Sequence, residues 1–186
     1  MFNTLIIKIS KMHNSHISIG LSNPKSPENV ASVMRAAANF RVDCVFYSGK
    51  RYPRAVKLNP TIPKISRKLS ENIPLSGVTC LISEAAENTK IVCVELVENA
   101  IPLPAYQHPE NAYYIFGPED GTINQKIIDQ ADAVVYVPTN GCMNLAATVN
   151  VVLYDRLVKL PDCITGNDLI RKNRDVNNNV KLSLIE

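Results

Sequence analysis

Short runs of apolar residues recur along this chain, and several are nearly continuous where a half-exposed strand would alternate with polar residues. The runs cover residues 16–22, 44–49, 91–97, 113–117 and 133–138. Continuous apolar strands suit a parallel sheet that is covered by helices on both faces. Segments with helical spacing separate the runs, which is the pattern of α/β proteins. We therefore predict an α/β fold with a mostly parallel sheet.

Three of the intervening segments carry helix signals. Ser26 and Pro27 form an N-cap followed by a proline at the first helical position, and apolar residues recur at helical spacing from Val30 onward. Residues 122–130 predict a short amphipathic helix, and residues 144–158 predict a longer one.

The longer helix has almost no polar face. Between residues 145 and 153, only Thr148 and Asn150 are polar. Such a helix must be buried by the sheet on one side and by something else on the other. A second copy of the chain is the natural candidate, so we predict a homodimer.

The length of 186 residues suits one domain. We assign residues 1–14 to a leader, 15–160 to the domain and 161–186 to a polar tail that we expect to be loosely ordered. No apolar run reaches the roughly 18 residues of a membrane span, and the N-terminus lacks the features of a secretory signal. We therefore expect a cytoplasmic protein without a membrane partner.

The cysteines and histidines give no metal-binding pattern. The chain has five cysteines, an odd number, and no CxxC pair, so we expect reduced thiols. None of the three histidines lies at a metal-ligand spacing from a cysteine. We expect no bound metal.

Residues 50–70 are strongly basic and contain no acid. Three prolines in this segment argue for an extended loop or a broken helix. Lysine and arginine neutralise nucleic-acid phosphates, and a tyrosine can stack on an unpaired base. The candidate RNA-contacting residues are Arg51, Tyr52, Arg54 and Lys57. The alternative is a solvated surface segment that merely lacks acids.

Polar or glycine-containing segments follow three of the predicted strands, where open α/β sheets place their ligand sites. In residues 23–40, Asn29 lies in the first turn of a helix, and Arg35 lies on a face with small or polar neighbours. Arg35 is either a substrate-contacting residue or a surface arginine.

The other two segments are FGPEDG at residues 116–121 and VPTNGCMNLAATVNVVLYD at residues 137–155. The glycines of the first allow a tight turn and close backbone approach to a ligand. The bland alternative for Glu119 and Asp120 is that they cap a helix starting near Thr122. In the second segment, a helix begins near Asn144, which is a suitable cap.

Together, in this order and spacing, the three segments resemble the three motifs of the SpoU (TrmH-type) branch of the SPOUT RNA methyltransferases. The resemblance implies a Rossmann-like α/β domain whose C-terminal part forms a trefoil knot. It also implies S-adenosylmethionine as cofactor, a dimer, and methylation of ribose 2′-hydroxyls in RNA.

The resemblance also implies roles for individual residues. The catalytic candidates are Asn29, Arg35, Glu119 and Asn144. The cofactor-binding candidates are Leu96, Gly117, Val137, Cys142 and Met143. The chain departs from the family pattern at Ala31, where glycine is usual, at Gly121, which comes one residue early, and at Cys142, which replaces a serine.

We therefore predict an S-adenosylmethionine-dependent RNA ribose 2′-O-methyltransferase, with tRNA favoured over rRNA as substrate. Because arginine almost never loses its proton in proteins, we assign Arg35 to orienting the ribose and binding phosphate. The main rival is a non-catalytic RNA-binding homologue. A base methyltransferase of another SPOUT branch is disfavoured by the Asn29-to-Arg35 motif, and a nicotinamide-dependent enzyme by the absence of a GxGxxG sequence after the first strand.

Overall fold

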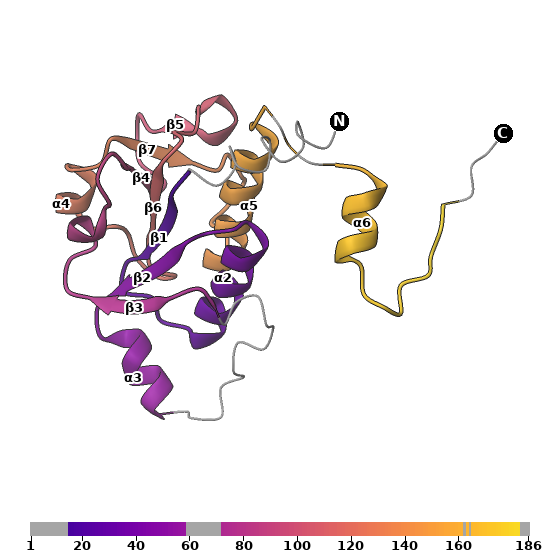
Figure 1. Cartoon of the computed structure of the whole chain (residues 1–186). Helices are drawn as coiled ribbons and strands as arrows, with labels where there is room; N and C mark the ends of the chain where they lie inside the picture. The colour runs from indigo at the N-terminus through magenta and orange to yellow at the C-terminus, as the bar shows by residue number, and fades with distance from the viewer. Residues whose placement is uncertain (1–14, 59–71, 162, 164, 183–186) are drawn as a thin grey trace.

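The strands of this protein form one parallel sheet, seen in a computed structural model that describes residues 15–58, 72–161, 163 and 165–182 (Figure 1). Within these residues the strand order is β3-β2-β1-β6-β4-β7-β5, and every neighbouring pair is parallel. The strands are β1 (Ile17–Leu21), β2 (Cys44–Ser48), β3 (Leu75–Val78), β4 (Lys90–Val94), β5 (Ile101–Pro102), β6 (Ala112–Phe116) and β7 (Ala133–Tyr136). The predicted α/β fold with a mostly parallel sheet is confirmed.

Helices cover both faces of the sheet. The helices of the described residues are α2 (Pro27–Asn39), α3 (Arg51–Leu58), α4 (Gln125–Ile128), α5 (Leu145–Val158) and α6 (Asn167–Asn173), of which α6 does not cover the sheet. Figure 1 shows α2 and α5 side by side against one face, with α4 on the opposite side. Short 3₁₀ turns at Ile82–Glu84 and Leu103–Ala105 complete the described elements.

Strand β6 lies at the centre of the core and explains why the apolar runs are continuous. Its residues Tyr114 and Phe116 pack in the cluster that α2 and α5 cover. The alternate residues Tyr113 and Ile115 pack in a second cluster on the other face. All four are essentially inaccessible to solvent, so both faces of the strand must be apolar.

Both long helices begin at the N-cap residues that the sequence predicted. The Ser26 hydroxyl accepts a hydrogen bond from the backbone N–H of Asn29, and Pro27 is the first helical residue of α2. The Asn144 side chain accepts from the backbone N–H groups of Ala146 and Ala147 at the start of α5. Each cap satisfies backbone donors that the first helical turn leaves unpaired.

The sequence left two alternatives for the basic segment, an extended loop or a broken helix. In its described part the structure has a helix, α3, from Arg51 to Leu58. Pro53 is tolerated because it lies in the first turn, where a backbone N–H has no helical partner. Residues 59–70 of the segment, like the predicted leader 1–14, lie outside the described residues.

Several elements were not predicted or were predicted too long. Strands β3 and β5 lie at the two edges of the sheet, where little apolar sequence is needed, and so carried no clear pattern. The run predicted over 91–97 ends as a strand at Val94, and the helix predicted over 122–130 is only the single turn α4. In the tail, α6 forms although all residues from 165 to 182 are exposed, and Figure 1 shows it apart from the sheet.

Within the described part of the chain, no helix combines the length and apolar character needed to cross a bilayer. The same residues contain no cluster of three or more histidine, cysteine or acidic side chains arranged to hold a metal ion.

Candidate functional site

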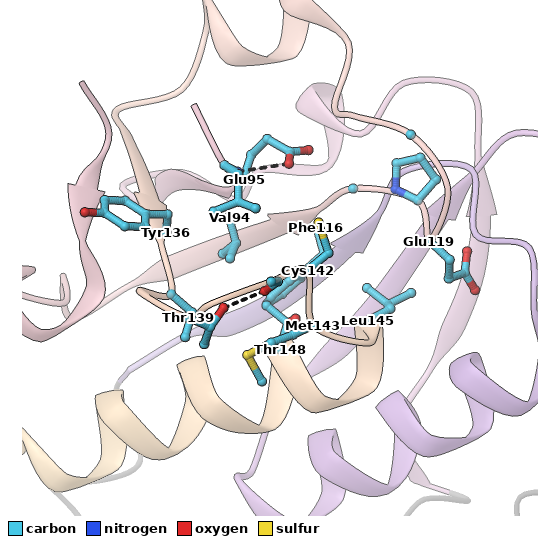
Figure 2. A pocket seen from close by; sticks show the side chains of 16 residues that line it. Val94, Glu95, Phe116, Glu119, Tyr136, Thr139, Cys142, Met143, Leu145 and Thr148 are labelled. Carbon is cyan, nitrogen blue, oxygen red and sulfur yellow. Dashed lines mark hydrogen bonds between the residues drawn. The ribbon is translucent and has the colours of Figure 1, made fainter. Parts of the chain in front are cut away.

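A pocket opens at the carboxyl ends of the neighbouring strands β4, β6 and β7 (Figure 2). Because these strands are parallel, the loops that follow them meet at one edge of the sheet, which is where α/β proteins bind ligands. The lining residues are Val94, Glu95, Leu96, Phe116, Gly117, Pro118, Glu119, Gly121, Tyr136, Val137, Thr139, Gly141, Cys142, Met143, Leu145 and Thr148.

All five predicted cofactor-binding residues line this pocket. They are Leu96, Gly117, Val137, Cys142 and Met143. Leu96 is 58% exposed, so its side chain is available to cover an apolar part of a ligand. The pocket therefore joins five predicted residues that are up to 47 positions apart in the sequence.

Glu95 is a pocket residue that the sequence analysis missed. Its Oε1 accepts a hydrogen bond of 3.0 Å from the backbone N–H of Leu96, and its Oε2 accepts one of 2.9 Å from that of Ile123. A Cβ atom on Gly117 would lie 2.7 Å from the Glu95 Oε2, so glycine makes room for the carboxylate. An acid directly after a buried apolar strand was the available signal.

A chain of side-chain hydrogen bonds joins the three motifs. The Asn29 Nδ2 donates to the Glu119 Oε1 at 3.0 Å, and the Asn144 Nδ2 donates to the Asn29 Oδ1 at 2.9 Å. The three residues come from α2, the loop after β6 and the start of α5. The structure therefore brings together three of the four predicted catalytic residues.

Glu119 lies at one end of this series of side-chain hydrogen bonds. Its carboxylate also accepts hydrogen bonds from the backbone N–H groups of Lys25, at 2.8 Å, and Ser26, at 3.0 Å. Partial burial opposes ionisation, but the hydrogen bonds from Asn29, Ser26 and Lys25 outweigh it and hold the pKa of Glu119 below its usual value. The alternative in which Glu119 caps the next helix is wrong, because Asn124 caps α4.

Comparison with known proteins decides the family. Residues 16–154 match the SpoU rRNA Methylase family. This chain belongs to that family. A curated relative, the 23S rRNA (guanosine-2′-O-)-methyltransferase RlmB of Acinetobacter baylyi, is 26% identical over 145 residues. The match covers 74% of this chain and 57% of the relative, so the chain spans little more than half of that relative's length.

Solved structures share the fold. An AdoMet-bound rRNA methyltransferase from Sinorhizobium meliloti superposes with a TM-score of 0.63 at 15% identity, over 78% of this chain and 57% of that one. The TrmH/SpoU tRNA modifying enzyme of A. aeolicus gives a TM-score of 0.61 at 14% identity, over 82% of each chain. At these identities the likeness establishes the fold.

The departures from the SpoU motif pattern fit the structure. Gly121, which comes one residue early, still lines the pocket, and so does Cys142 in place of the usual serine. Ala31, in place of glycine, is half-buried on α2. None of the three is among the residues with a left-handed backbone, so none requires a glycine for that reason.

Arg35 is not part of the hydrogen-bond network that joins Asn29, Glu119 and Asn144. It is exposed on α2, and no hydrogen bond joins it to Asn29, Glu119 or Asn144 among the described residues. Its catalytic role stays a prediction. An exposed guanidinium without a structural duty remains available to a substrate.

The basic helix α3 contributes to the site through Arg51. Both terminal nitrogens of Arg51 donate to the carboxylate of Asp120, at 2.7 and 2.8 Å, and Lys25 lies 3.4 Å from the same group. The hydrogen bond from Arg51, followed by that from Lys25, lowers the pKa of Asp120 to about 2. Arg51 therefore ties α3 to the FGPEDG loop in this structure, and its contact with RNA stays a prediction.

The other three predicted RNA-contacting residues differ among themselves. Tyr52 is half-buried, and its ring packs edge-on against Tyr47 with centroids 4.9 Å apart. Burial raises the pKa of Tyr52. Tyr52 therefore has a packing role in this structure, and its stacking on an RNA base stays a prediction. Arg54 and Lys57 are exposed and remain free to meet phosphates.

Proposed function

We propose that this chain is an S-adenosylmethionine-dependent RNA ribose 2′-O-methyltransferase. One observation carries the proposal: the five cofactor-binding candidates line one pocket at the strand ends, and hydrogen bonds join three of the four catalytic candidates, Asn29, Glu119 and Asn144, beside it. Asn29 bonds to both Glu119 and Asn144, so one network joins residues from all three motifs.

The pocket suits the proposed cofactor. Leu96, Val137 and Met143 offer apolar surface to the adenosine, while Gly117 and Cys142 lie on loops whose backbone can approach it closely. When bound, S-adenosylmethionine supplies an electrophilic methyl group. The solved S. meliloti relative is described as AdoMet-bound, which supports the same cofactor here.

The polar catalytic candidates have two different roles in this proposal. We assign Arg35 to orienting the ribose and its phosphate, because its guanidinium keeps its charge and forms directed hydrogen bonds. Asn29, Glu119 and Asn144 fix the start of α2 against the start of α5, and so position α2, which carries Arg35. Correct placement of reacting groups is itself a large part of catalysis.

For the substrate we favour tRNA over rRNA. The names of relatives point both ways, since one is an rRNA enzyme and another a tRNA modifying enzyme. Exposed Arg54 and Lys57 on α3 supply positive charge close to the site without selecting either RNA. The division into domain and tail, the trefoil knot and a cytoplasmic location belong to the same proposal.

A homodimer is part of the proposal. In α5, Ala147, Val151, Tyr154 and Val158 follow i, i+4, i+7, i+11 spacing and form a stripe that is less buried than the core-facing side of the helix. Val151 still packs partly against the core, whereas Tyr154 and Val158 are exposed. Tyr154 is 59% and Val158 45% exposed. An apolar stripe of this kind fits a second helix, most simply that of another copy.

Incubation with S-adenosylmethionine carrying a labelled methyl group tests the activity. Total tRNA and rRNA from cells lacking this protein are the substrates, and nuclease-resistant 2′-O-methylated dinucleotides are the product. We expect label in a single ribose position, in tRNA. Label in rRNA alone would show that rRNA, and not tRNA, is the substrate. RNA binding without transfer to either pool would favour the non-catalytic homologue.

A further inference from the structure

The pocket has an unbalanced charge. Among its described lining residues, Glu95 and Glu119 are the only acidic side chains, and no lysine, arginine or histidine lines it. The nearby basic residues Lys25 and Arg51 are engaged with Asp120 and do not line the pocket. The pocket therefore presents negative charge to whatever it binds.

The two carboxylates are not equivalent. Glu119 already accepts three hydrogen bonds, from two backbone N–H groups and from Asn29. Glu95 accepts one hydrogen bond on each oxygen, from Leu96 and Ile123. A carboxylate offers about four acceptor positions, so Glu95 keeps capacity toward a ligand. Figure 2 shows Glu95 beside Val94 at the strand end, with Glu119 at a different place on the rim.

We propose that Glu95 makes the pocket select its ligand by charge, so that it holds the cationic sulfonium cofactor more tightly than the neutral thioether product. This inference rests on the proposed function. It assigns Glu95 as a specificity-determining residue, in addition to its hydrogen bonds to the loops that follow β4 and β6.

The reaction itself changes the charge that Glu95 meets. The bond between the methyl carbon and sulfur breaks, and its electron pair stays on sulfur, which becomes a neutral thioether. The ribose 2′-oxygen forms the new bond to the methyl carbon, and the hydroxyl proton passes to water. The cofactor thus loses one positive charge, and its attraction to Glu95 falls at the moment when the product must leave.

The shape of the pocket and its charge can be separated by substitution. Glu95→Gln keeps the size of the side chain and one acceptor oxygen but removes the charge. Glu98→Gln is the matched control, because Glu98 is exposed, lies three residues further on the same loop and does not line the pocket. Glu95→Asp keeps the charge on a shorter side chain.

Calorimetry on the full chain would measure dissociation constants for S-adenosylmethionine, S-adenosylhomocysteine and sinefungin, which carries an amine in place of the sulfonium. We expect the wild type to favour the two cationic ligands. Glu95→Gln should reduce this preference by about two- to fivefold, the range of a partly exposed charge pair. Glu98→Gln should leave it unchanged, and Glu95→Asp should retain it even if all affinities fall.

Each outcome has a definite meaning. Equal weakening of all three ligands by Glu95→Gln would show a structural role alone and overturn the inference. An unchanged preference for the cationic ligands in Glu95→Gln would also overturn the inference, but it would leave S-adenosylmethionine as the proposed cofactor. If none of the three ligands binds the folded wild type, both the proposed function and this inference are wrong. Added salt should reduce the wild-type preference, because it screens partly exposed charges.

Discussion

The side-chain amide of Asn144 donates a 2.9 Å hydrogen bond to Asn29, which lies 115 residues earlier in the chain. The same side chain turns its oxygen toward the backbone N–H of Ala146, at 2.9 Å, and caps α5. One residue therefore stabilises a helix with its oxygen and joins two motifs with its nitrogen. The capping role of Asn144 and its bond to Asn29 can be tested separately.

Substitution of Asn144 should separate stability from activity. Asn144→Ala removes both contacts, so it should lower the free energy of unfolding by about 1 kcal/mol and reduce methyl transfer. Asn144→Asp keeps the capping oxygen but cannot donate to Asn29, so it should retain stability and lose activity. Urea unfolding and the methylation assay measure the two effects. Full activity in Asn144→Asp would show that the bond to Asn29 is dispensable.

Arg35→Ala should abolish methylation while the fold and the cofactor affinity stay nearly intact. The side chain is exposed and has no packing role on α2. We expect a loss on the order of a hundredfold or more in turnover, as for the removal of an orienting or charge-stabilising group. Turnover at saturating RNA is the decisive measurement. A wild-type rate there would remove Arg35 from the catalytic site.

Two arginines on α3 should behave differently, although they are three residues apart. Arg51→Ala breaks the pair with Asp120, so it should loosen the FGPEDG loop and weaken cofactor binding without RNA present. Arg54→Ala leaves that pair intact and should weaken only RNA binding, with a smaller dependence on salt. Calorimetry with cofactor and filter binding with RNA distinguish them. Identical effects of the two variants on the cofactor would contradict this assignment.

Stability should fall as the pH drops below about 6.5, the ordinary pKa of histidine. The His108 ring is buried between the Tyr114 hydroxyl, at 2.6 Å, and the Asp155 carboxylate, at 2.9 Å. Burial lowers the pKa of His108 and outweighs the opposing effect of Asp155. The unfolded chain therefore binds a proton at a higher pH than the folded chain, and protonation favours unfolding.

Urea unfolding between pH 5 and pH 8 measures this dependence. The contribution of His108 should be complete above about pH 6.5 and should decline as the pH falls toward the lowered folded-state pKa. His108→Gln should flatten the profile in that window. His16→Gln is the control, because His16 is only partly buried. If the His108 variant kept the wild-type slope, another group would be responsible.

Tyr154→Lys should convert the proposed dimer to a monomer, because it places a charge in the exposed stripe of α5. Leu169→Lys on α6 is the control, since Leu169 is also an exposed apolar residue but lies in the tail. Sedimentation measures the mass of each variant. A monomeric Leu169→Lys beside a dimeric Tyr154→Lys would move the interface to α6.

Local sequence patterns were sufficient where a single segment carried the whole signal. The continuous apolar run of β6 required a strand buried on both faces, and Ser26 and Asn144 marked the starts of α2 and α5. These features depend on hydrophobic periodicity and on local capping, which neighbouring residues encode. The resemblance to the SpoU family, rather than a local pattern, indicated the cofactor-binding candidates, which line the pocket: Leu96, Gly117, Val137, Cys142 and Met143.

Contacts between distant segments were decided only by the tertiary structure. Nothing near Arg51 in the sequence shows that it pairs with Asp120, 69 residues away, and nothing near Glu95 shows that it accepts from Ile123. Each pairing exists because parallel strands bring the loops at their carboxyl ends to one edge of the sheet. A side chain's partner there is set by strand order, and strand order is a property of the whole chain.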